Sequence, residues 1–207
     1  MEQTLAEKAY LGIKKLIISN HYFAGVPLQE QELVKKLHIS RTPIREALIR
    51  LKHEKLVEII SQKGAFVSKL SVQNLQELFQ IREIIEPKIT ELVTDTISIE
   101  KLCNIERQLL YLKTKKEIDC SEFYKVGRKL HDLILNSTRN KTLIQFFKDL
   151  NDEISRACYF ATTKYGNTQK FFEQHLEIIA ALKARDSVRA RQKMLEHILS
   201  AKSSIIE

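Results

Sequence analysis

Two neighbouring stretches of the chain decide its fold: Leu37-His-Ile-Ser-Arg-Thr-Pro-Ile-Arg-Glu-Ala-Leu48 and Lys63-Gly-Ala-Phe-Val67. The first has apolar residues at helical spacing after a serine, which is a residue type that begins helices. The second lies in a run of β-branched and aromatic residues, where Gly64 supplies the positive φ of a tight turn. Together the two stretches predict a helix over residues 41–54 followed by a hairpin over 57–68.

Two more helices are predicted before this unit, over residues 3–19 and 29–37, with a tight turn at His38. Helix, helix, turn, helix and two-stranded hairpin is the order of elements in a winged helix-turn-helix. In that fold the last helix enters the major groove of DNA, and the wing reaches the backbone or the minor groove. We therefore expect residues 1–70 to form a DNA-binding domain.

The distribution of charge agrees with a polyanionic partner. The chain has a net charge of +8, of which residues 1–70 contribute +5 from 12 Lys and Arg and 7 Asp and Glu. Arg41, Thr42 and Arg45 lie off the apolar stripe of the predicted recognition helix. Arg can fork onto guanine, and hydroxyl groups suit phosphates. The competing interpretation, a solvated surface helix, is the weaker one because the wing and the preceding helix accompany these residues.

Composition indicates a mainly α protein. Only five Gly and three Pro occur in 207 residues, which argues against an all-β chain with frequent turns. The second part of the chain has apolar residues at helical spacing, and short loops favour an antiparallel bundle over residues 71–207. Its predicted helices span residues 72–95, 98–116, 120–137, 140–164, 168–184 and 187–205.

Several classes of protein are excluded by what the sequence lacks. No apolar run approaches 18 residues, and the first residues have no signal-peptide profile. The three cysteines are scattered, which fits a reducing compartment. We therefore expect a cytoplasmic protein that does not contact membranes. It has no HExxH motif, P-loop or dinucleotide fingerprint, and we expect no enzymatic activity.

The first third of the chain resembles the DNA-binding domain of bacterial transcription regulators of the GntR family. The match rests on Ser40-Arg-Thr-Pro-Ile-Arg-Glu-Ala-Leu48 and on the wing sequence Lys63-Gly-Ala-Phe-Val67. His38 and Lys55 depart from the family pattern, because each replaces a common Gly; His tolerates the left-handed conformation. The resemblance implies that DNA is contacted by Gln31, Ser40, Arg41, Thr42, Pro43, Arg45, Lys63 and Gly64.

The rest of the chain resembles the all-helical effector domain of the FadR branch of that family, called the FCD domain. The matching features are an Arg-x-x-x-Glu pattern beginning at Arg82, a Leu-His pair ending at His131 with Asn140 after it, and later Glu-x-His and Glu-His pairs. In such proteins a carboxylate and three His bind a divalent metal, and a small carboxylate effector lies over it. The resemblance implies effector contacts from Arg82 and Asn140.

The implied metal ligands are His131, His175 and His197, and each lies on an apolar stripe of its helix. Three neutral imidazoles suit Zn²⁺ or Ni²⁺. The acidic ligand of the family would lie four residues before the first His, and here that residue is Gly127. Two possibilities therefore stay open: a three-His site completed by water or effector, or a pocket that has lost its metal.

The leading functional hypothesis is a homodimeric regulator, a repressor rather than an activator, that reads a pseudo-palindromic operator in double-stranded DNA and responds to a small carboxylate. A second hypothesis keeps the DNA binding but not the sensing. A third is a three-His metal enzyme, since such a site with an open position also describes catalytic zinc. The absence of a carboxylate base at Gly127 counts against the third hypothesis.

Overall fold

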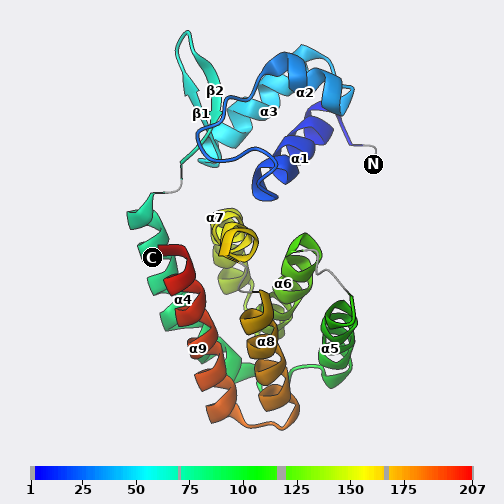
Figure 1. Ribbon diagram of the computed structural model, residues 1–207, viewed down its shortest axis with the longest axis vertical. Coiled ribbons are helices and arrows are strands. Elements are labelled where there is room, and N and C mark those ends of the chain that lie inside the picture. Colours follow the sequence, from blue (N-terminus) through cyan, green and yellow to red (C-terminus); the bar gives the residue numbers. More distant parts are fainter. Residues whose placement is uncertain (1–2, 70, 116–119, 166–167, 207) are drawn as a thin grey trace. The chain divides into compact units, whose positions relative to one another are not determined.

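The computed structural model describes residues 3–69, 71–115, 120–165 and 168–206. The chain divides into two compact units, Met1–Ser71 and Val72–Glu207, which are called the head and the bundle below (Figure 1). The predicted fold class is confirmed: the protein is mainly α, with a winged helix-turn-helix followed by a helical bundle.

The head contains three helices and a two-stranded wing. The strands pair antiparallel, with Val57 opposite Val67 and Ile60 opposite Gly64. Gly64 has a φ of 95°, as expected for the turn of this hairpin. The elements are α1 (Leu5–Ile18), α2 (Glu30–Leu37), α3 (Arg41–His53), β1 (Val57–Ile60) and β2 (Gly64–Val67).

The turn between α2 and α3 has the left-handed residue that helix-turn-helix motifs require. His38 has φ 55° and ψ 39°, and Lys55, after α3, has φ 57°. Both positions where the sequence departs from Gly therefore keep the backbone conformation that Gly favours. Ser40 precedes α3 with an extended backbone, but its hydroxyl makes no capping hydrogen bond. The predicted helix start is right, and the side-chain cap is absent.

The bundle contains the remaining helices. The most extensive contact between two of these helices is that of α4 with α9, and α9 also packs against α8. Figure 1 shows α4 and α9 running side by side along the bundle. The elements are α4 (Val72–Val93), α5 (Ile99–Lys113), α6 (Cys120–Ser137), α7 (Lys141–Tyr165), α8 (Thr168–Lys183) and α9 (Ser187–Ile206).

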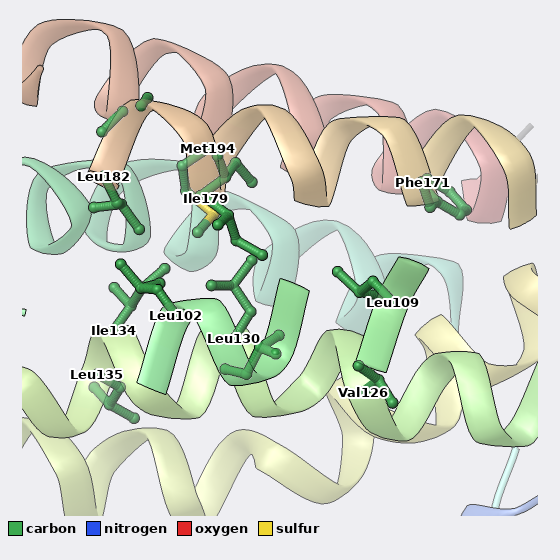
Figure 2. Packing of buried hydrophobic residues seen from close by; sticks show 14 of the residues in the cluster. Leu102, Leu109, Val126, Leu130, Ile134, Leu135, Phe171, Ile179, Leu182 and Met194 are labelled. Carbon is green, nitrogen blue, oxygen red and sulfur yellow. The ribbon is translucent and has the colours of Figure 1, made fainter. Parts of the chain in front are cut away.

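A continuous apolar core fills the bundle and fixes the faces of its helices. Leu130 on α6, Ile179 on α8 and Met194 on α9 are fully buried in it (Figure 2). Each of the three predicted ligand histidines lies on one of these helices, within five residues of the core residue just named. Packing of the core therefore turns the histidines inward. Among the described residues, no helix is both long enough and apolar enough to span a membrane.

Replacing His38 with Gly is expected to stabilise the head. A left-handed residue that has a Cβ costs about 1–2 kcal/mol, part of which is offset because Gly loses more freedom on folding. We expect a net gain of up to about 1 kcal/mol, measured by hydrogen exchange of peptides from α2 and α3 in the full chain. Lys35→Gly, within α2, is the control and should lose about 1 kcal/mol. Reduced protection in both variants would contradict the assignment of strain to His38.

Candidate functional site

The start of α3 presents a polar surface to solvent. Arg41, Thr42 and Arg45 are exposed, as is Ser40 before them, and Pro43 is half-buried. The opposite face of the helix packs into the core of the head through Ile44, Ala47, Leu48 and Leu51. The structure thus places the predicted recognition residues on the face that core packing leaves open.

The other predicted DNA contacts are also exposed. Gln31 lies in the first turn of α2, and Lys63 and Gly64 lie at the tip of the wing. All of them belong to the head, where helix N-termini and a hairpin tip are available to a phosphate backbone.

Arg45 is held by a carboxylate that the sequence analysis did not single out. Its Nε donates to both Glu30 carboxylate oxygens, at 2.8 and 3.0 Å. This hydrogen-bonded pair joins α3 to α2 and raises the pKa of Arg45. The two residues are 15 positions apart on different helices, so no local pattern in the sequence could have identified the pair.

In the bundle, the structure brings the three predicted histidines together. His131 on α6, His175 on α8 and His197 on α9 each offer a ring nitrogen, and these nitrogens lie within 4.8 Å of one another. His175 and His197 are buried, and His131 is partly buried. The Nε2 atoms of His131 and His197 are 3.3 Å apart.

Hydrogen bonds on the far sides of two rings determine which nitrogens face one another. His131 Nδ1 donates to Glu86 Oε2 at 2.7 Å, and His197 Nδ1 donates to Gln174 Oε1 at 3.3 Å. Carboxylate and amide oxygens only accept, so each neutral ring has its proton on Nδ1. Both Nε2 atoms then carry lone pairs that face each other, an arrangement that a cation, either a shared proton or a metal ion, would stabilise.

The donor set fits a metal ion. Two imidazole nitrogens on a tetrahedral Zn²⁺, with bonds of about 2.0–2.1 Å, are about 3.3–3.4 Å apart. The 3.3 Å between the Nε2 atoms of His131 and His197 matches this spacing. In addition, His175 Nδ1 is buried and has no hydrogen-bond partner among the described residues. A buried nitrogen without a hydrogen bond among the described residues, beside two facing lone pairs, is the arrangement expected of three imidazoles that share one ion.

Burial keeps the histidines in the form that ligation requires. It lowers the pKa of His175 to about 3, with a smaller contribution in the same direction from His131. Burial and the neighbouring His175 also lower the pKa of His197 well below its ordinary value. Both rings are therefore neutral near pH 7, as metal ligands must be.

Glu86 connects the histidines to a buried arginine. Its Oε1 accepts from Arg82 Nε at 2.5 Å, while its Oε2 accepts from His131. Burial alone would raise the pKa of Glu86, but the charge of Arg82 and the hydrogen bond from His131 hold it well below its ordinary range. The resemblance implied an effector contact for Arg82. In the structure Arg82 pairs with Glu86 within α4, and the pair is buried.

The histidine cluster and Arg82 border one cavity of about 50 Å³. A water molecule needs roughly 10–15 Å³ measured in this way, so a small ligand fits. Gly127 lies in the wall, and a Cβ built on it would be 2.6 Å from His175 Cε1. The lining residues are Arg82, Phe123, Tyr124, Gly127, Arg128, His131, Ile154, Phe171, His175, His197 and Ala201.

Asn140, predicted to contact the effector, has a different role. It is exposed and does not line this cavity. Its side-chain oxygen accepts from Leu143 N at 3.0 Å, which caps the start of α7. An Asn directly before a helix is a common N-cap, and this local role accounts for its position.

Comparison with known proteins connects both units to one kind of protein. The gntR family of bacterial regulatory proteins matches residues 5–67, and the FCD domain matches residues 77–200.

Individual relatives match along the whole chain. The transcriptional repressor RspR of Escherichia coli is 24% identical over 98% of this chain and 90% of its own. A GntR-type regulator from Rhodococcus sp. RHA1 superposes with a TM-score of 0.83 over 97% of both chains, at 17% identity. The FCD domain of a further regulator, in a structure described as metal-free, has a TM-score of 0.60 over 67% of this chain and 96% of its own, at 20% identity.

Breaking the buried pair of Arg82 and Glu86 from either side should be costly. Arg82→Met removes the charged partner of the buried Glu86 carboxylate, and Glu86→Gln removes the charged partner of the buried Arg82 guanidinium. Each should lower the free energy of unfolding by about 3–5 kcal/mol. The double variant removes both charges and keeps an acceptor for His131, so it should be more stable than either single variant. Urea unfolding of the full chain measures this, and additive losses would contradict the pairing.

Proposed function

The chain belongs to the GntR family of bacterial regulatory proteins and is a DNA-binding transcription regulator with an FCD domain, and we propose that it is a repressor that responds to a small carboxylate. Its family and relatives are transcription regulators rather than enzymes, which confirms the expectation that the chain is not an enzyme. We place its action in the cytoplasm, where bacterial DNA lies. A relative that matches 98% of this chain and 90% of its own carries the name of a repressor.

DNA is read by the head. The observation that carries this proposal is the exposed start of α3, where Arg41, Thr42 and Arg45 have no role in the core. The pair with Glu30 engages Arg45 through Nε, and the two remaining nitrogens of a guanidinium can fork onto O6 and N7 of guanine. Ser40, Pro43 and Gln31 flank this surface, and Lys63 and Gly64 contact the DNA backbone from the wing.

A homodimer would read a pseudo-palindromic operator, because two copies related by a two-fold axis contact two half-sites. The bundle has apolar residues in solvent that suit such an interface. Ile84 and Leu92 on α4 are 68% and 69% exposed, and Val188 on α9 is 71% exposed. Large apolar side chains exposed on adjacent helices are typical of association surfaces.

The effector would bind in the cavity beside the three histidines. Arg82 offers a guanidinium, which recognises carboxylates in a bidentate manner. His131, His175 and His197 would hold Zn²⁺ or Ni²⁺ there, and the bound cation would supply a Lewis-acidic position facing the cavity. An effector-independent regulator is the alternative, and the second experiment below distinguishes the two.

Replacing Arg45 with Ala should weaken operator binding by about 1–3 kcal/mol, the worth of one bidentate base contact. The assay is fluorescence anisotropy with a duplex that carries a site selected by the wild-type chain from random sequence. Lys52→Ala removes one positive charge from the far end of the same helix and serves as the control. Equal affinities for the wild-type chain and the Arg45 variant would contradict the proposed docking of α3.

A small carboxylate should release the wild-type chain from its operator and raise its melting temperature, because a ligand at a hundred times its Kd adds about 2.7 kcal/mol of stability. We suggest screening mono- and dicarboxylates with Zn²⁺ or Ni²⁺ present. The double variant Arg82→Met with Glu86→Gln should bind the operator without responding. A screen in which no carboxylate changes either quantity would favour the effector-independent regulator.

A further inference from the structure

The histidine cluster has no carboxylate of its own. Among the described residues, the group that could hold an ion contains His131, His175 and His197 and no acidic residue. All three ligands are neutral, so an ion with two positive charges would enter a buried site without compensation from its ligands. Burial of an unpaired charge is costly.

Two acidic residues beside the cluster, Glu86 and Asp132, are paired with arginines. Glu86 accepts from Arg82 and His131, and Asp132 accepts from Arg128 Nη2 at 2.9 Å. Each carboxylate thus offsets one guanidinium. Both guanidiniums line the cavity, and neither carboxylate does. Arg128 Nε is moreover buried, and no residue in the described part of the chain forms a hydrogen bond with it. The surroundings of the cluster therefore favour an anion in the cavity.

Gly127 contributes no anion to the wall of the cavity. The ring of His175 occupies the space next to it, and a Cβ at this position would lie 2.6 Å from Cε1 unless the ring shifted. Since no acidic residue joins the cluster among the described residues, we expect the negative charge to come from a molecule that enters the cavity.

We propose that the metal ion and a small carboxylate bind to this cluster interdependently, each raising the affinity of the other. This rests on the proposed effector pocket. The carboxylate compensates the charge of the ion and meets Arg82, and the ion gives the carboxylate a second positive partner. Linkage requires that the two enhancement factors be equal. Coupling of this kind typically amounts to about five- to 150-fold, so the bundle would respond most strongly when both are present.

The test uses Co²⁺ as the metal and acetate as the anion, because the visible absorption of Co²⁺ reports its ligands without any assay of regulation. The chelator-stripped full chain is titrated with Co²⁺ in acetate and in chloride at equal ionic strength, with correction for the Co²⁺ bound by free acetate. We expect Co²⁺ to bind about tenfold or more tightly in acetate, and acetate to bind more tightly by the same factor in the presence of Co²⁺.

Two variants at position 127 distinguish the effect of an added negative charge from the effect of an added Cβ atom. Gly127→Asp places a carboxylate beside the cluster and should bind Co²⁺ equally well in acetate and in chloride. Gly127→Ala adds the same Cβ without a charge and should keep the dependence on acetate. His175→Ala should lose Co²⁺ binding in both buffers. If the aspartate variant does not fold, the wild-type titration still decides the question.

Equal Co²⁺ affinity in the two buffers would overturn the interdependence while leaving a three-histidine metal site. Absence of Co²⁺ binding in both buffers would overturn it as well, and would indicate that a shared proton stabilises the facing nitrogens. Operator binding by the same preparation, measured by anisotropy, tests the proposed regulator separately. A chain that binds its operator and fails the Co²⁺ test contradicts only this inference.

Discussion

The carboxylate of Glu86 is the group on which the chemistry of the bundle depends. One oxygen holds the guanidinium of Arg82, and the other holds Nδ1 of His131. Without it, the buried guanidinium of Arg82 would lose the carboxylate that offsets its charge beside the cavity, and the proton of His131 would be free to move to the nitrogen that faces His197. A single side chain on α4 therefore affects both the charge beside the cavity and the direction of the His131 lone pair.

The head uses a carboxylate in a comparable way at its surface. Glu30 holds Arg45 through Nε, and this restricts a long side chain that would otherwise lose rotamer freedom on meeting DNA. An acidic residue near a phosphate backbone also disfavours non-specific attachment. The pair would thus contribute to specificity more than to affinity. In both units a carboxylate orients the group that recognises a ligand.

The features predicted from the sequence are those with local causes. The head follows from helical spacing, a tight turn and Gly64, and the inward direction of His175 follows from the apolar stripe of its own helix. The contacts that join distant parts of the chain have no such cause, and Glu30 with Arg45 is an example. The resemblance implied an effector contact for Asn140, whereas its local signal as an N-cap is the one that the structure shows.

Gly127 shows how a substitution changes more than the group it removes. In the sequence, Gly127 stands where the family has an acidic ligand. In the structure, the ring of His175 packs into the space next to Gly127. The charge that the chain no longer supplies must come from the effector, and Arg82 would receive it on α4, the helix that follows the wing in the chain. An effector changes operator affinity only if it binds two states of the protein unequally. The pairing of Arg82 with Glu86 is a contact that an anion would alter directly, and it is there that the two states should differ.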